Sequence, residues 1–434
     1  MKYSQFNTII PYEDNYIFHN SLTNKFIHLV PFLKELIEAS KNENNIDGLK
    51  SIHLDLYNSL IDMGFLIEKN TNEVQKVKDL IHAIDYNEEE YYLIINPTMN
   101  CNFDCWYCYE THEKNSKVSD ISLNKMKKFI YHAINENKKL KKFTLQFFGG
   151  EPLLYFKKTV LPLMKYVFHE SKTNNIDLYI NFTTNGYLIN DEMIKSFKKY
   201  NVNGLQITFD GNRENHNKVR FTSKSTGPYD KIVENIKKLI KNNINITFRV
   251  NYTKKNLVGL DEILKDFDDL SIDERNKITL SMNKVWEEKS NELGDKVIYF
   301  KEKAEKFGFR LPDALFNDRV RHSCYADKYN QATINYNGDV YKCNAREFDK
   351  QTREGILEDN GTINWNDKLD LRLSEKINFN KSCSECNILP ICGGGCSQQH
   401  LEYQNIDYCI YNYDDNEKNN LILDMFLSEK TNNV

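Results

Sequence analysis

The sequence lacks the features that mark several common classes of protein. No run of eighteen apolar residues occurs in its 434 residues, so we expect no transmembrane helix. The segment Met1–Asp14 has no basic stretch followed by an apolar core, so we expect no export signal. Net charge is only -4, with lysines interleaved among acidic residues, so we expect no basic surface that would bind nucleic acid. We therefore expect a cytoplasmic protein whose partners include neither nucleic acid nor membrane.

What the sequence does contain is ten cysteines. In a cytoplasmic chain, cysteines in this number indicate metal or redox chemistry before disulfides. The length allows two or three domains, and a hydrophobic content of 40% is adequate for a folded core.

Three of these cysteines follow a predicted strand closely. Cys101, Cys105 and Cys108 have the spacing C-x3-C-x2-C. Three thiolates on one loop can hold three irons of a cubane iron–sulfur cluster, which leaves the fourth iron open to a small molecule. The alternatives are a zinc site and a chance group of buried thiols.

This spacing, with an aromatic residue just before the third cysteine, resembles the signature of the radical S-adenosylmethionine (SAM) enzymes. The resemblance implies that Cys101, Cys105 and Cys108 hold a [4Fe–4S] cluster whose open iron is chelated by SAM. It implies that one electron cleaves SAM to a 5′-deoxyadenosyl radical, which abstracts hydrogen from the substrate. Tyr107 would then lie near the adenine, and the electron would come from an external donor such as flavodoxin or ferredoxin.

Between residues 90 and 310 the sequence predicts strands and helices in alternation. The predicted strands are Tyr91–Ile95, Phe143–Phe148, Leu178–Thr183, Leu205–Phe209, Asn245–Val250 and Ile278–Met282. The predicted helices include Ile121–Asn135, Phe156–His169, Asp191–Tyr200, Tyr229–Lys241 and Leu257–Leu270. Such alternation indicates a parallel α/β sheet with right-handed crossovers. Six units are too few for a complete eight-stranded barrel, and they resemble the partial (β/α)6 TIM barrel of the radical SAM family.

Several motifs come directly after these strands, where parallel sheets bind their ligands. Gly149 and Gly150 allow a ligand to approach the backbone closely, and Glu151 offers an acceptor suited to an ammonium group. Alone, this segment would be an ordinary turn. Its position resembles the family motif that holds the amino group of SAM.

Two further turn signals follow the third and fourth strands. Thr184 and Asn185 resemble the ribose-side motif of the family, and Asp210 resembles the fourth-strand motif. The resemblance extends to Arg220, whose guanidinium suits the carboxylate of SAM. His216 is expected to brace the loop and not to act in catalysis.

Residues 1–85 form a separate predicted unit. Segments 16–19 and 25–29 read as a hairpin, Pro31 can open a helix, and a second helix is predicted over residues 49–63. The pattern is winged-helix-like but lacks a basic recognition helix. It resembles the leader-peptide recognition domains of radical SAM peptide maturases, in which a peptide adds a strand to a sheet edge. The alternative is a lid or packing domain.

Residues 311–434 hold the other seven cysteines, with a hairpin predicted at Asn337-Gly338. They are Cys324, Cys343, Cys383, Cys386, Cys392, Cys396 and Cys409. Glycine alone fills the gap from Cys392 to Cys396, which lets the backbone wrap a metal closely. A pair of structural zinc sites is the alternative to iron–sulfur clusters.

This arrangement resembles the SPASM domain, which carries two auxiliary [4Fe–4S] clusters and brings the expected total to three. The resemblance assigns Cys383, Cys386, Cys392 and Cys409 to one auxiliary cluster, and Cys324, Cys343 and Cys396 to the other. Anaerobic sulfatase maturases have a further cysteine where this chain has Asp318, so Asp318 or a substrate group is a candidate fourth ligand. They also have a catalytic aspartate where this chain has Asn344, and no replacement base is evident.

The sequence therefore predicts three domains: residues 1–85 for leader recognition, 90–310 for the radical SAM barrel, and 311–434 for SPASM. The expected activity is modification of a ribosomally made precursor peptide, with an intramolecular thioether or carbon–carbon cross-link as product. The alternatives are a sulfatase-maturating enzyme, a peptide epimerase and a zinc-stabilised peptide-binding protein without catalysis.

Overall fold

The protein is described by a computed structural model that covers residues 1–221, 227–290, 293–313, 317–403 and 408–432. It divides into two compact units. The sheet unit comprises Glu88–Pro312 and Asn330–Asp367. The three-segment unit comprises Met1–Asn87, Asp313–Tyr329 and Lys368–Val434. Within the described ranges, no helix is long and apolar enough to cross a membrane.

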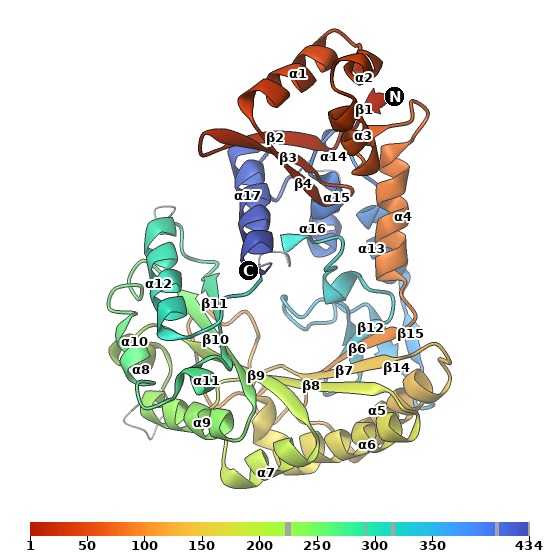
Figure 1. Ribbon diagram of the computed structural model, residues 1–434. Coiled ribbons are helices and arrows are strands. Elements are labelled where there is room, and N and C mark those ends of the chain that lie inside the picture. The colour runs from red at the N-terminus through yellow and green to blue at the C-terminus, as the bar shows by residue number, and fades with distance from the viewer. Residues whose placement is uncertain (222–226, 291–292, 314–316, 404–407, 433–434) are drawn as a thin grey trace. The chain divides into compact units, whose positions relative to one another are not determined.

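The sheet unit is built on one ten-stranded sheet of order β11-β10-β9-β8-β7-β6-β12-β13-β14-β15 (Figure 1). The strands are β6 (Glu90–Ile95), β7 (Lys142–Phe147), β8 (Asp177–Thr184), β9 (Val202–Phe209), β10 (Asn245–Tyr252), β11 (Ile278–Lys284), β12 (Gln331–Ile334), β13 (Asp339–Tyr341), β14 (Gly355–Leu357) and β15 (Ile363–Trp365). Neighbours from β6 to β11 pair in parallel, which confirms the predicted parallel α/β sheet. The sheet continues beyond β6, because β12 pairs with it in parallel and the β12–β13 hairpin follows.

Helices of the sheet unit cover one face of these parallel strands (Figure 1). They are α5 (Asp120–Asn135), α6 (Leu161–Thr173), α7 (Asp191–Lys199), α8 (Arg213–Val219), α9 (Tyr229–Lys241), α10 (Glu262–Lys265), α11 (Ile272–Arg275) and α12 (Gly294–Phe307). The core between the layers is apolar: in α9, for example, Ile232, Ile236 and Leu239 recur at helical spacing and are completely buried.

Two predicted helices differ from what the structure shows. The segment Leu257–Leu270 forms only the short α10 among tight turns, because Gly259 adopts a left-handed conformation with φ of 71°. The segment beginning at Phe156 starts as a π-helical turn and becomes α-helical only at Leu161. Pro162 lies in the first turn of α6, where its missing N–H costs no helical hydrogen bond.

The N-terminal segment of the three-segment unit contains two small sheets. β1 (Lys2–Tyr3) pairs with β5 (Leu66–Ile67), and β2 (Asn7–Tyr12), β3 (Asn15–Asn20) and β4 (Lys25–Leu29) form an antiparallel sheet. The predicted hairpin is therefore present. Its helices are α1 (Pro31–Asn42), α2 (Leu49–Ile52), α3 (Leu54–Asp62) and α4 (Glu73–Asp85). His53 interrupts the predicted second helix, and α4 is a helix that the sequence analysis did not predict.

The remaining segments of this unit contribute further helices, of which α17 is the longest. They are α13 (Asp367–Lys376), which starts at the unit boundary, α14 (Lys381–Ser384), α15 (Leu389–Cys392), α16 (Ser397–Glu402) and α17 (Asp415–Asn432). Residues 1–87 thus share a compact unit with six of the seven C-terminal cysteines, whereas Cys343 belongs to the sheet unit. The three predicted domain boundaries stay a prediction.

Candidate functional site

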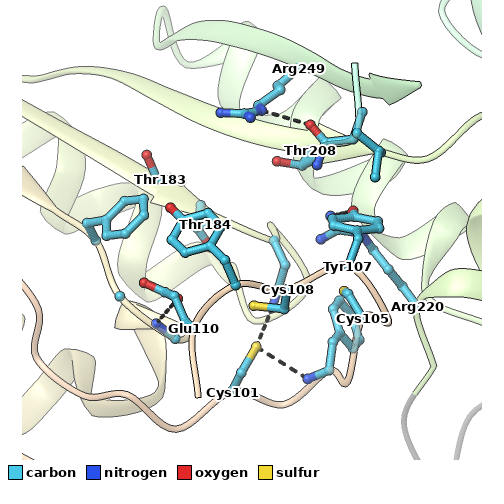
Figure 2. Close-up of a pocket in the computed structure, with 18 of the residues that line it drawn as sticks. Cys101, Cys105, Tyr107, Cys108, Glu110, Thr183, Thr184, Thr208, Arg220 and Arg249 are labelled. Atoms are coloured by element: carbon cyan, nitrogen blue, oxygen red, sulfur yellow. Dashed lines mark hydrogen bonds between the residues drawn. The ribbon is translucent and has the colours of Figure 1, made fainter. Parts of the chain in front are cut away.

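A pocket of about 190 Å³ opens at the carboxyl ends of the parallel strands in the sheet unit (Figure 2). The loops after β6, β7 and β11 and the ends of β8, β9 and β10 contribute to it. This is the edge at which parallel α/β sheets bind ligands, because each strand ends there in a loop of free sequence.

The cysteine loop after β6 contributes three thiols to this pocket. Cys101, Cys105 and Cys108 all line it, and Sγ of Cys101 accepts a hydrogen bond of 3.4 Å from the backbone N–H of Phe103. Burial raises the pKa of Cys101 and of Cys108 to about 12, and it raises that of Cys105 too. Buried thiolates need a positive charge beside them, which bound iron supplies. The donor set therefore fits an iron–sulfur cluster.

Gly149 and Gly150 bring the next loop directly against the cysteine loop. Both have positive φ, of 78° and 49°, and a Cβ atom on Gly150 would lie 2.3 Å from the carbonyl oxygen of Asn100. Only glycine permits this approach. The backbone N–H of Gly150 donates to Oε2 of Glu110 at 2.9 Å.

Glu151, which follows, is completely buried and already has partners on both carboxylate oxygens. Oε1 accepts from the N–H of Leu153 at 3.0 Å and from Oγ1 of Thr184 at 2.8 Å. Oε2 accepts from the N–H of Asn185 at 2.8 Å. Burial raises the pKa of Glu151, and these hydrogen bonds oppose the rise. Glu151 therefore ties the glycine loop to the end of β8, and its predicted contact with the amino group of SAM stays a prediction.

Tyr107, Asp210 and Arg220 form a buried cluster beside the cysteines. Arg220 donates from Nε to Asp210 at 2.5 Å and from Nη2 to the Tyr107 hydroxyl at 2.9 Å, and that hydroxyl donates to Asp210. Nδ1 of His216 accepts from the N–H of Asp210 at 3.4 Å. Burial lowers the pKa of His216 to about 3, so the ring is neutral, as suits a residue that braces the loop.

Two charged residues of this pocket were not predicted from the sequence. Glu110 has a raised pKa of about 7 because it is buried, and its Oε1 has no hydrogen-bond partner among the described residues. Arg249 is half-buried near the end of β10, and its Nε donates to Oδ1 of Asn251 at 2.9 Å. Both carried a signal: Glu110 follows Cys108 by two residues, and Arg249 is a charge within a predicted apolar strand.

A second, smaller pocket of about 40 Å³ lies within the three-segment unit. It is lined by the four cysteines predicted to hold one auxiliary cluster, Cys383, Cys386, Cys392 and Cys409. Burial raises the pKa of Cys392 to about 12. The glycines between Cys392 and Cys396 all have positive φ, from 64° to 104°, which lets the chain turn closely around this pocket. Lys418 of α17 is the one cation among its lining residues.

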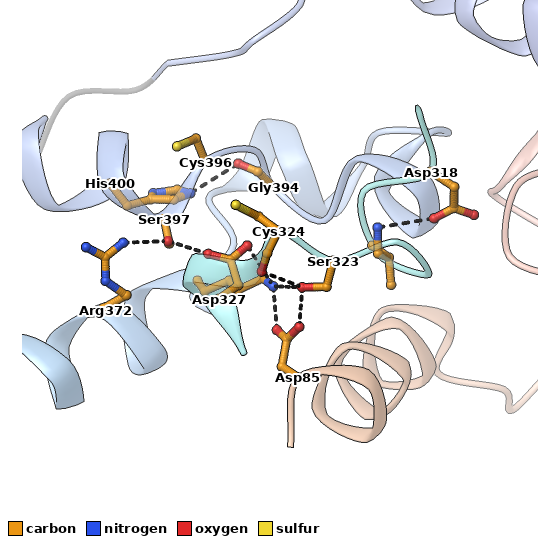
Figure 3. Close-up of polar contacts among 12 residues, drawn as sticks. Asp85, Asp318, Ser323, Cys324, Asp327, Arg372, Gly394, Cys396, Ser397 and His400 are labelled. Atoms are coloured by element: carbon orange, nitrogen blue, oxygen red, sulfur yellow. Dashed lines mark hydrogen bonds and ion pairs between the residues drawn. The ribbon is translucent and has the colours of Figure 1, made fainter. Parts of the chain in front are cut away.

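Cys324 and Cys396 belong to segments that a buried polar network connects within the three-segment unit (Figure 3). Ser397 donates to Asp327, and the N–H of Asp327 donates to the carbonyl oxygen of Cys324 at 2.9 Å. Lys376 lies between Asp327, at 3.1 Å, and Asp85. Cys343, predicted to share a cluster with Cys324 and Cys396, follows β13 in the sheet unit.

The carboxylate of Asp318 forms its hydrogen bonds with neighbouring residues of its own segment. Its carboxylate accepts from Nη1 of Arg321 at 2.6 Å and from the backbone N–H groups of Val320 and Arg321 at 3.1 and 2.9 Å. These partners count against Asp318 as a cluster ligand. The backbone oxygen of Asn344 accepts from the hydroxyl of Tyr109 at 2.9 Å.

Across the described residues, no three His, Cys, Asp or Glu side chains are gathered closely enough to hold a single metal ion. The ligand assignments thus depend on cysteine spacing and on the shared pockets.

Comparison with known proteins is consistent with this geometry. Residues 95–271 match the family model of the Radical SAM superfamily. The chain is 25% identical over 342 residues to a cysteine-type anaerobic sulfatase-maturating enzyme of Clostridium novyi (strain NT), covering 70% of this chain and 87% of that one. It shares its fold with anSMEcpe bound to AdoMet and the Cp18Cys peptide, with a TM-score of 0.57, 17% identity, and coverage of 79% and 98%. It also shares its fold with Streptococcus suis SuiB bound to the precursor peptide SuiA, with a TM-score of 0.51, 17% identity, and coverage of 93% and 97%.

Proposed function

Since this chain is an enzyme with a radical SAM domain and is homologous to anaerobic sulfatase-maturating enzymes, we propose that it modifies a ribosomally made peptide by hydrogen abstraction. A radical SAM domain implies SAM and a [4Fe–4S] cluster, and together these supply a 5′-deoxyadenosyl radical. The observation that carries the proposal is the meeting of three cysteine thiols with the charged side chains of Glu110, Arg220 and Arg249 in one pocket at the strand ends.

In this proposal the residues of the pocket have separate roles. Cys101, Cys105 and Cys108 hold the cluster. Glu110 accepts the ammonium group of SAM, because its Oε1 is buried without a partner and Gly150 fixes its other oxygen. Glu151 positions the surrounding loops, and Glu110 takes its place as the proposed acceptor of the ammonium group, because both carboxylate oxygens of Glu151 already have partners. These roles require no movement of the loop that contains Gly149 and Gly150.

The proposal extends to the SAM contacts predicted around this pocket. Tyr107 would contact the adenine, and Thr184 and Asn185 would lie on the ribose side. Asp210 orients Arg220, whose remaining N–H groups serve the SAM carboxylate.

For the rest of the chain we propose a partial (β/α)6 barrel, a winged-helix-like module at residues 1–85 and a SPASM domain with two auxiliary [4Fe–4S] clusters. The shared pocket of Cys383, Cys386, Cys392 and Cys409 supports the first auxiliary cluster. The second would be held by Cys324, Cys343 and Cys396. The auxiliary clusters suit a net two-electron oxidation, because the carbon radical must lose an electron for a new bond to close.

A peptide substrate is supported by two proteins of the same fold that were solved with peptides bound. The N-terminal module would hold the leader, and the antiparallel sheet offers two edge strands, β2 and β4, for strand addition. A flavodoxin or ferredoxin would supply the electron. The product we propose is an intramolecular thioether or carbon–carbon cross-link.

The second candidate is sulfatase maturation, which the 25% identity over 342 residues favours. Asn344 and Asp318 count against it, because the sulfatase maturases have a catalytic aspartate and a cysteine at these positions. Epimerisation of a peptide residue is a third possibility within the same chemistry.

The first experiment is anaerobic reconstitution of the full chain, followed by assays for iron, acid-labile sulfide and 5′-deoxyadenosine. Brown protein with sulfide that converts SAM to 5′-deoxyadenosine is expected, and colourless protein with zinc alone would contradict the proposal. Co-expression with a short peptide encoded beside this gene then tests the product. A loss of two hydrogens per cross-link is expected by intact mass. An unchanged mass would exclude cross-linking of that peptide and point to epimerisation or to a protein substrate.

A further inference from the structure

Arg249 is a half-buried charged residue of the sheet-unit pocket for which the proposed chemistry has no role, whereas Lys284 and Glu287, which also line the pocket, are exposed. It lies near the carboxyl end of β10, in register with Thr208 of β9 and Ser281 of β11. Its strand neighbours Phe248 and Val250 are completely buried in the core. Because side chains alternate along a strand, Arg249 lies on the face opposite that core, and it lines the pocket.

The charge of Arg249 is not compensated by an ion pair in the described part of the chain. Its Nε donates to Oδ1 of Asn251, and no carboxylate of the described residues forms an ion pair with the other N–H groups of the guanidinium. Arginine keeps its charge at any ordinary pH, so a half-buried guanidinium favours an anion beside it. Burial also lowers the pKa of Arg249, because removing the guanidinium from water disfavours its charged form.

Arg220, the other arginine of the pocket, is placed differently. It forms a buried ion pair with Asp210, and it donates a hydrogen bond to the hydroxyl of Tyr107 in the cysteine loop. Arg249 instead shares the pocket with Tyr109, which stacks on Trp286 at a ring distance of 5.3 Å. Figure 2 draws Arg249 across the pocket from Cys101 and Cys108. Arg220 thus lies on the side of the cysteines, and Arg249 lies across the pocket from them.

We propose that Arg249 binds a carboxylate of the peptide substrate, so that the enzyme selects peptides with an acidic group close to the residue that loses hydrogen. Trp286, whose side chain is 63% exposed at the pocket rim, would contact the neighbouring peptide backbone or side chains. This inference rests on the proposed function. The carboxylate has two sources in a peptide, an Asp or Glu side chain and a free C-terminus, and SAM contains a third.

The test is selection from a random heptapeptide library by the reconstituted enzyme in the presence of SAM. The library is prepared once with C-terminal amides and once with free carboxylates. We expect the wild type to enrich Asp and Glu over Asn and Gln about tenfold at one position, or to enrich the free acids by as much. Arg249→Gln should abolish that preference, and Arg249→Lys should keep part of it, because a lysine retains the charge without the fork of donors.

Lys284→Gln is the matched control, since Lys284 also lines the pocket but is exposed and donates to the carbonyl oxygen of Ser290. Its loss should leave the preference intact. The formation of 5′-deoxyadenosine without peptide shows that each variant is folded and loaded. The inference is overturned if the wild type shows no preference for either kind of carboxylate, or if Lys284→Gln loses the preference equally. It is also overturned if Arg249→Gln weakens SAM binding about tenfold while peptide selection is unchanged, because the carboxylate is then that of SAM. A wild type that forms no 5′-deoxyadenosine contradicts the proposed function itself.

Discussion

The two cysteine pockets of this chain differ in the number of thiols and in what surrounds them. In the sheet unit three thiols share a larger pocket with Glu110, Arg220 and Arg249. In the three-segment unit four thiols share a small pocket with tyrosines, apolar side chains and one lysine. Three thiols leave an iron open, and the charged groups nearby can orient what binds there. Four thiols can complete a cluster's ligands, and a lining made mainly of apolar and aromatic side chains suits electron transfer without ligand binding.

The sharpest way to break this comparison is to remove one thiol from each pocket. We expect Cys105→Ala to abolish formation of 5′-deoxyadenosine, because the SAM-binding cluster loses a ligand, whereas Cys392→Ala should retain it and lose peptide modification. With the three clusters we propose, iron content should fall by about a third in each variant. Asp104→Asn, an exposed change in the same loop as Cys105, is the control and should behave as the wild type. Equal loss of 5′-deoxyadenosine in both cysteine variants would contradict the distinction.

The two units also differ in their buried ion pairs. In the sheet unit Arg220 pairs with one carboxylate, Asp210, whereas in the three-segment unit Lys376 lies between two, Asp85 and Asp327. Lys376→Met leaves Asp85 and Asp327 buried without their shared cation, and we expect it to cost about 3–5 kcal/mol in free energy of unfolding. Urea unfolding of the full chain measures this loss. Lys381→Met removes an exposed lysine of the same unit, 3.9 Å from Glu385, and should change stability little. Similar midpoints for the two variants would show that the network does not stabilise the unit.

Glu110, which lines the sheet-unit pocket, and Glu347, which lies near it outside the pocket lining, differ in whether their carboxylate oxygens have partners. Oε1 of Glu110 has no described partner, whereas Glu347 accepts from the N–H of Thr111 at 3.0 Å. We expect Glu110→Gln to weaken SAM binding about tenfold and Glu347→Gln to leave it nearly unchanged. The spectral change of the reconstituted cluster on SAM addition gives the affinity. Equal affinities for both variants would remove Glu110 from the SAM site.

The smallest effect is expected at the four-thiol pocket. Burial acts to lower the pKa of Lys418, but Asp415, Cys386 and Cys409 outweigh it and the pKa is raised; the side chain is 12% exposed. A cation stabilises the reduced cluster, so Lys418→Gln should make one reduction potential about 50 mV more negative in anaerobic titrations followed by electron paramagnetic resonance. Lys381→Gln, whose charge is screened by solvent beside Cys383, should shift it much less. Identical shifts would show that Lys418 has no special relation to the cluster.

Much of the fold follows from local patterns in the sequence. All six predicted parallel strands are present, since each is a short apolar run bounded by turn residues. The helix predicted at Leu257–Leu270 was wrong because one residue, Gly259, adopts a conformation that ends the ladder. The parallel pairing of β12 with β6 could not be foreseen, because it joins segments more than 200 residues apart and leaves no periodic signal in either.

The site divides in the same way. Sequence alone determined which residues are chemically unusual: the cysteine spacings, the paired glycines and the residues after each strand, because these depend on neighbours along the chain. Only the tertiary structure decided how their charges are used. In the structure the carboxylate of Glu151 accepts hydrogen bonds from Thr184 and Asn185, and Asp210 forms an ion pair with Arg220. Glu110 and Arg249 line the pocket. The physical reason is that hydrogen bonds and ion pairs depend on distances of a few ångströms between residues far apart in sequence, which only folding sets.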